Sequence, residues 1–118
     1  MHPDLTPIQR MDELDELLTD TGDRPVVLFK HSYSCGISAE ALDELVDYLN
    51  SDGADAARYA LVTVQTHRDV SNAVATRFGI RHETPQALII RDGRVVWSAS
   101  HFRVTRQAVE AAVKAAAQ

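Results

Sequence analysis

The hydrophobic positions of this chain switch repeatedly between the spacing of a helix and the unbroken run of a buried strand. Met11, Leu14, Leu17 and Leu18 follow helical spacing on an acidic background, whereas residues 25–30 form a nearly continuous apolar run. A period near 3.6 predicts an amphipathic helix, and a short apolar run beside turn residues is typical of a strand buried on both faces. The alternation predicts helices over about 11–20, 38–49, 70–78 and 105–113, and strands over 25–30, 59–64, 87–91 and 94–98.

The second predicted helix shows the helical pattern most clearly. Leu42, Leu45, Val46 and Leu49 stand at i, i+3, i+4 and i+7, with acidic residues on the outer face. We therefore expect these four side chains to face the core.

The order of the elements determines the expected architecture. Segment 5–9 is either a short edge strand or, because it contains Thr-Pro, a helix start. With the strand, the order is β-α-β-α-β-α-β-β-α. Strands separated by helices pair in parallel, whereas Asp92-Gly93 predicts a type I′ hairpin between the last two strands. We expect an α/β protein with a mixed central β-sheet flanked by helices on both faces.

Length and charge narrow the possible functions. The 118 residues, 45% of them hydrophobic, suit one domain spanning 1–118. The formal net charge of −5 argues against nucleic acid as a partner, because phosphate binding requires a basic surface. Most acidic residues lie in the first half of the chain, so an anionic partner would meet the arginine-richer second half.

Membrane and metal functions find no support in the sequence. The longest apolar runs, 26–29 and 87–90, are too short for a leader peptide or a membrane span. We expect a soluble cytoplasmic protein with no membrane partner. The five histidines show no metal-ligand spacing and have no partner cysteine, so we expect no intrinsic metal.

Cys35 is the only cysteine, and it lies between a predicted strand and a predicted helix. Unpaired backbone N–H groups and the positive end of the helix dipole meet there and favour the reactive thiolate. By composition alone, a lone cysteine is more often a small buried hydrophobe. One cysteine excludes an internal disulfide, so redox chemistry would pass through a mixed disulfide with another molecule. We expect a monomer, with an intermolecular disulfide dimer left open.

Two motifs resemble the active site of the thioredoxin superfamily. They are Cys35-Gly36-Ile37-Ser38 at a helix start and Thr84-Pro85 ahead of a strand. The resemblance covers nearly the whole chain and implies a thioredoxin-like fold. It also implies a cis bond at Thr84-Pro85 facing the active-site sulfur, although the sequence itself shows only an X-Pro bond at a strand start.

Within the superfamily, the chain most resembles the monothiol bacilliredoxins, the YtxJ-like family. Their pattern is a Lys-His-Ser strand end followed by Thr-Cys-Pro-Ile-Ser, which residues 30–38 match except at Ser34 and Gly36. Segment 96–102 is similar to that family's Ala-Ser-His-aromatic segment. Gly36 stands where that family has proline, so this chain lacks that rigid residue at the helix start.

The resemblance implies that Cys35 removes a low-molecular-weight thiol, bacillithiol, from S-thiolated client proteins. No tightly bound cofactor is implied, and a second small thiol or a thiol reductase would regenerate Cys35. Ser38 stands where a dithiol enzyme has its resolving cysteine, and its hydroxyl is placed to hydrogen-bond the thiolate. Lys30 and His31 are expected to add positive potential near the sulfur. Strand alternation puts them on opposite faces, so we expect at most one of them to point directly to the site. The residues implied to complete the motif or bind the substrate and small thiol are Ser34, Gly36, Ile37, Lys30, His31, Thr84, Pro85 and His101.

Two alternatives remain open from the sequence. Residues 35–38 differ by one residue from the Cys-Gly-Phe-Ser signature of monothiol glutaredoxins, which share an iron–sulfur cluster with glutathione. Residues 98–105 nevertheless contain neither glycine nor aspartate of that family's glutathione-binding motif. The other alternative is a non-catalytic thioredoxin-fold binding module, in which Cys35 is inert and a peptide is recognised beside Thr84-Pro85.

Overall fold

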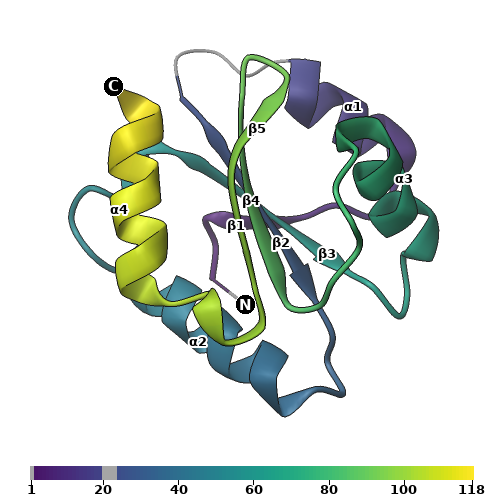
Figure 1. The fold of residues 1–118 in the computed structure, drawn as a ribbon, viewed down its shortest axis with the longest axis horizontal. Coiled ribbons are helices and arrows are strands. Elements are labelled where there is room, and N and C mark those ends of the chain that lie inside the picture. The colour runs from purple at the N-terminus through teal and green to yellow at the C-terminus, as the bar shows by residue number, and fades with distance from the viewer. Residues whose placement is uncertain (1, 20–23) are drawn as a thin grey trace.

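A five-stranded sheet with the order β1-β3-β2-β4-β5 divides the molecule into two helical layers. The computed structural model describes residues 2–19 and 24–118. Helices α2 and α4 cover one face of the sheet, and α1 and α3 cover the other (Figure 1). The elements are β1 Leu5–Pro7, α1 Met11–Thr19, β2 Val26–His31, α2 Gly36–Leu49, η1 Ala54–Ala56, β3 Arg58–Thr63, α3 Arg68–Phe78, β4 Gln86–Arg91, β5 Arg94–Ser100, η2 His101–Arg103 and α4 Arg106–Ala117.

The pairing of the strands confirms the mixed sheet. β1 and β2 run parallel to β3, whereas β4 is antiparallel to both β2 and β5. Asp92 and Gly93 both have positive φ, 53° and 76°, as the type I′ hairpin requires. Segment 5–9 supplies the edge strand β1 rather than a helix start. The predicted end of the first helix, near residues 20–23, lies outside the described residues.

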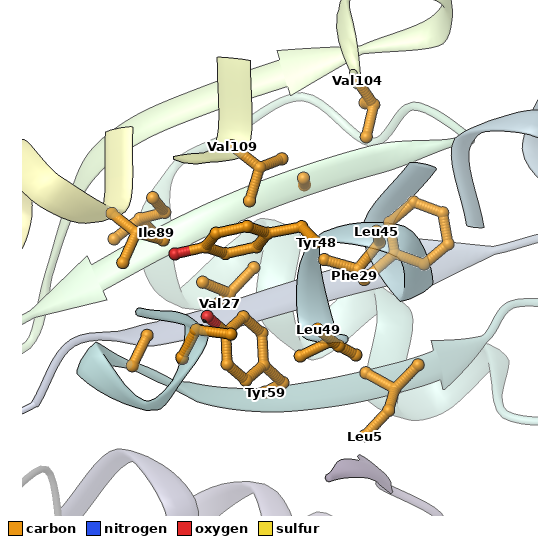
Figure 2. Close-up of a cluster of buried hydrophobic side chains, with 14 of the residues drawn as sticks. Leu5, Val27, Phe29, Leu45, Tyr48, Leu49, Tyr59, Ile89, Val104 and Val109 are labelled. Carbon is orange, nitrogen blue, oxygen red and sulfur yellow. Dashed lines mark hydrogen bonds between the residues drawn. The ribbon is translucent and has the colours of Figure 1, made fainter. Parts of the chain in front are cut away.

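Each face of the sheet has its own apolar core, and β2 contributes to both. Val27 and Phe29 pack under α2 and α4, whereas Val26 and Leu28 pack under α1 and α3. Figure 2 shows the first cluster, with the Tyr48 ring of α2 between the sheet and Val109 of α4. Because side chains alternate along a strand, the last two residues of β2 also point to opposite helical layers.

Helix α2 buries a stripe that only partly matches the predicted one. Leu45 and Leu49 are buried as predicted, whereas Leu42 and Val46 are only partly buried and Ala41 and Tyr48 are buried instead. The helix also begins earlier, at Gly36. Alanine and tyrosine carry a weak hydrophobic signal, so the leucine spacing alone gave a face rotated away from the true one.

Candidate active site

Cys35 lies where β2 gives way to α2, at the carboxyl ends of the parallel strands β2 and β3. We call this end of the sheet, with residues 31–35, 84–85 and 100–101, the Cys35 edge. Cys35 is a free, partly exposed thiol with extended backbone angles, φ −116° and ψ 122°. Its carbonyl accepts the Ala39 N–H at 3.1 Å, and its side chain makes no capping hydrogen bond. The sulfur is therefore free to react at the start of a helix.

Gln65 holds the loop that precedes the cysteine. Its amide Nε2 donates to the hydroxyls of Ser32 and Ser34 at 2.6 and 2.9 Å. Its Oε1 accepts the Tyr33 N–H at 3.4 Å. One side chain from the β3–α3 connection thus contacts three consecutive residues before Cys35. Sequence reasoning missed Gln65, and the available signal was its position just after a strand that is parallel to β2.

Ser38 is fully buried and ties the first turn of α2 to the end of β2. Its Oγ accepts the Ser32 N–H at 2.9 Å and lies 2.8 Å from His31 Nδ1. His31 stacks on Phe29, with ring centroids 6.0 Å apart. These two partners occupy the serine hydroxyl, in place of the thiolate contact expected from the sequence.

The expected positive potential from His31 does not fit this environment. Burial lowers the pKa of His31 below its ordinary value of 6.5, so the ring is neutral at neutral pH. A neutral imidazole buried against Ser38 fixes the helix start and adds no charge beside the sulfur.

Gly36 and Ile37 form the first turn of α2. Gly36 is exposed, and a Cβ built there would meet no atom within 4 Å. Ile37 lines a small cavity of about 80 Å³ together with His101 and Phe102 of η2. The first turn of the Cys35 motif therefore lies beside His101 and Phe102 of segment 96–102, which the family resemblance also singled out. A larger hollow of about 750 Å³ lies between β1 and segment 51–59, and none of the predicted site residues lines it.

The Thr84-Pro85 bond is cis, as the resemblance implied. Gln86 pairs with Lys30 of β2, which places Pro85 beside the end of that strand at the Cys35 edge. The Pro85 carbonyl accepts the His101 N–H at 2.9 Å. His101, with φ 56°, also lies 3.4 Å from a carboxylate oxygen of Glu83. The fold therefore brings His101 and Thr84-Pro85 to one end of the sheet.

Of the two basic residues at the end of β2, Lys30 is the one that points away from Cys35. Its side chain is fully buried, and its Nζ lies 2.9 Å from the Ser71 carbonyl and 3.2 Å from His82 Nδ1, on the α3 side of the sheet. Burial lowers the pKa of Lys30 to about 8. Strand alternation points this residue away from α2, so burial removes it from direct contact with a small thiol at Cys35.

The described residues contain no cluster of three or more His, Cys, Asp or Glu side chains arranged to hold a metal ion. Among the helices in residues 2–19 and 24–118, none is long and apolar enough to cross a membrane.

Comparison with known proteins identifies a matching family and the same fold. A family model described as monothiol bacilliredoxin BrxC matches residues 6–109. A solved structure described as a candidate oxidoreductase with a thioredoxin fold is 26% identical, with a TM-score of 0.82, and the match covers 92% of this chain and 93% of that one. The thioredoxin of Fasciola hepatica is 16% identical, with a TM-score of 0.74 and coverage of 95% and 99%. Malassezia sympodialis thioredoxin is 18% identical, with a TM-score of 0.75 and coverage of 97% and 91%. The two thioredoxins show a shared fold only.

Proposed function

Because this chain belongs to the monothiol bacilliredoxin BrxC family, we propose that it is a thiol–disulfide oxidoreductase that removes bacillithiol from S-thiolated proteins. One observation carries the proposal: the chain's single thiol, Cys35, is accessible at a helix start, and a buried serine stands one turn later. A thiol at the N-terminus of a helix is favoured as thiolate, the form that attacks disulfides. With Ser38 in the resolving position, the reaction ends at a mixed disulfide.

The proposed reaction exchanges one disulfide for another. The Cys35 thiolate attacks the bacillithiol sulfur of the client's mixed disulfide, and a new S–S bond forms as the old one breaks. The client leaves as a thiolate and takes a proton from solvent. A second bacillithiol thiolate, or the thiolate of a reductase, then attacks the bacillithiol sulfur on Cys35. Cys35 leaves as a thiolate with the electron pair of the broken S–S bond. Cys35 is thereby reduced, and the incoming thiol is oxidised to a disulfide with bacillithiol.

The neighbouring residues have supporting roles in this proposal. Ser34 and Ser38 hold the cysteine loop through Gln65 and His31, while Gly36 and Ile37 start the helix that presents the sulfur. Thr84-Pro85 and His101 form the opposite wall, where a client segment or the carboxylates of the small thiol would bind. The His101 N–H donates to the Pro85 carbonyl, and its exposed ring lies beside Glu83 at this wall.

The decisive test follows both proteins by intact mass. A client carrying bacillithiol on one cysteine is mixed with the purified protein, and Cys35→Ser serves as control. We expect the client to lose bacillithiol and the wild type, but not the variant, to gain one bacillithiol at Cys35. An unmodified client and an unmodified wild-type protein would refute the proposal.

Two further arms separate the alternatives. Turnover of a glutathionylated client, but not of the bacillithiolated one, would reject the named thiol and keep the reaction. A coloured dimer after reconstitution with iron, sulfide and glutathione would favour the glutaredoxin-like cluster carrier. Tight peptide binding that is unchanged in Cys35→Ser, without any thiol transfer, would favour the binding module.

A further inference from the structure

Lys30 is a buried ammonium held only by neutral groups. Its hydrogen-bond partners are the Ser71 carbonyl and the His82 ring. It is one of only two lysines in the chain, and the other, Lys114, has a side chain that is 74% exposed. A buried charge without an ionised partner costs stability, and an apolar residue of similar volume is commonly as stable or more so. The fold alone therefore gives no reason for a lysine here.

The surrounding polar groups are also incompletely satisfied. Gln86, the β4 residue paired with Lys30, has a buried Oε1 without a hydrogen-bond partner among the described residues. Native proteins satisfy nearly all buried polar atoms, and titratable groups with shifted pKa values gather at functional sites. A cluster that combines a buried ammonium with an unpaired acceptor is typical of a functional rather than a stabilising arrangement.

The direction of each hydrogen bond follows from the chemistry of the donors. An ammonium has no acceptor, so Lys30 Nζ must donate to His82 Nδ1 at 3.2 Å. A neutral imidazole that accepts at Nδ1 carries its proton on Nε2. That Nε2–H lies 3.3 Å from the Thr84 hydroxyl and donates to it. The Thr84 oxygen is thereby an acceptor toward His82, and its own proton remains available to another partner.

Thr84 is the residue before Pro85, and it is partly buried at the Cys35 edge. The chain of hydrogen bonds thus runs from the interior on the α3 side to the wall opposite Cys35. We propose that Lys30 is a positioning residue for the exchange reaction, acting through His82 to hold the Thr84 hydroxyl as a donor toward the bound disulfide or small thiol. The inference rests on the proposed function, because it assigns a role at the same site.

The chain requires a neutral His82. Protonation would place an N–H on Nδ1, which would face the Lys30 ammonium and end the hydrogen bond. The groups acting on this ring are Lys30 from β2 and Arg68 from α3, which lower its pKa, and the neighbouring Glu83, which raises it. Glu83 is itself paired with His101 of η2. Burial is the largest cause, and the pKa of His82 lies below 6.5, so the ring is neutral at pH 7.

The first experiment compares steady-state kinetics of four variants on a bacillithiolated client. We expect Lys30→Met to lower kcat/KM by about tenfold, mainly through KM, because a misoriented donor weakens substrate binding. Lys114→Met, the matched lysine control, should match the wild type. His82→Gln keeps an acceptor and a donor but cannot titrate. It should therefore retain most of the wild-type kcat/KM. It should not show the loss of activity at acidic pH that protonation of His82 is expected to cause in the wild type. His82→Leu should resemble Lys30→Met.

The kinetic results of the four variants decide whether Lys30 positions Thr84. A folded Lys30→Met with wild-type kcat/KM and pH profile would overturn the inference. If Lys30→Met does not fold, the His82→Gln and His82→Leu pair decides, because equal losses in both would mean that hydrogen-bond positioning is not the cause.

The second experiment does not depend on activity. The Ser71 hydroxyl also lies near His82 Nδ1, at 3.3 Å, so the NMR experiment removes it as well. Nitrogen-15 NMR of the histidine rings should show His82 with its proton on Nε2 in the wild type and in Ser71→Ala, and a mixture of tautomers in the Lys30→Met/Ser71→Ala protein. The same tautomer in Ser71→Ala and in the double variant would overturn the inference. If the wild type fails to transfer bacillithiol yet shows this tautomer change, the proposed function is wrong and the positioning of Thr84 by Lys30 stands.

Discussion

Replacing Lys30 by methionine should stabilise the protein at neutral pH and change how its stability depends on pH. Burial lowers the pKa of Lys30 from 10.5 to about 8, so folding disfavours the ammonium. Each pKa unit corresponds to about 1.4 kcal/mol, and the charged lysine therefore costs the folded state about 3 kcal/mol at pH 7. The substitution removes this cost. It leaves no buried acceptor stranded, because the Ser71 carbonyl lies within helix α3 and His82 Nδ1 keeps the Ser71 hydroxyl as a partner at 3.3 Å.

The sign of the pH effect follows from proton binding. Between about pH 8 and 10.5 the unfolded chain keeps the lysine proton and the folded chain has lost it, so the wild type becomes more stable as pH rises. The Lys30 contribution amounts to about 2 kcal/mol between about pH 7 and 9.5. Lys30→Met should show no such rise, so its advantage over the wild type should shrink as pH increases.

Urea unfolding at constant ionic strength measures this difference, with Lys114→Met as the exposed-lysine control. The upper limit stays below about pH 10, because burial raises the pKa of Tyr48 and Tyr59 and the unfolded tyrosines would ionise first. We expect the free energy of unfolding of the wild type and of Lys114→Met to rise equally with pH, while that of Lys30→Met stays constant. A Lys30→Met protein that is less stable than the wild type at every pH, with the same slope, would refute the reasoning.

Three shorter predictions follow from other parts of the structure. Gly36→Pro should raise the free energy of unfolding by about 0.5–1 kcal/mol in urea titrations, because the site is the first helical position and a Cβ there meets no atom within 4 Å. Cys35 already has the extended backbone that precedes proline. A decrease would show that the turn needs glycine. Ser38→Cys should yield an internal disulfide in place of the bacillithiol adduct, detected by intact mass, since residues three apart are neighbours on a helix; a persistent adduct would contradict this. The free energy of unfolding should fall as pH drops from 6.5, because burial lowers the pKa of His31 and His82, so the unfolded chain binds protons first. A His31→Gln/His82→Gln protein should lose this dependence in the same titration.

The order of elements was predictable because period and turn chemistry are local signals. The apolar run before Cys35 became β2, and Asp92-Gly93 made the expected hairpin. The short 3₁₀ helix after β5 was not predicted, since its backbone follows from the contact between His101 and Pro85. Such a contact depends on the register of β4 and β5, which no local pattern in segment 100–103 records.

The place of the single cysteine was predictable, but the network around it was not. Cys35 stood out because it is alone at a strand-to-helix junction. Gln65 and His82 lie 30 and 47 positions further along the chain and enter the site only through strand pairing and loop closure. The charge expected on His31 failed on burial, because the sequence shows where a basic residue is and not how deeply it lies. Lys30 keeps its charge at neutral pH and is the residue of the pair that strand alternation turns away from Cys35.

In the proposed mechanism, the last two residues of β2 connect the interior to both walls of the site. Side-chain alternation sends His31 toward α2, where it meets Ser38, and sends Lys30 toward α3, where it meets His82. The first link holds the turn that presents Cys35, and the second reaches Thr84 on the opposite wall. Neither residue needs to touch a substrate to affect the reaction. A Lys-His pair at the end of a central strand can therefore set the position of the nucleophile relative to the substrate wall. A direct electrostatic role for either residue would not require these two hydrogen-bond links.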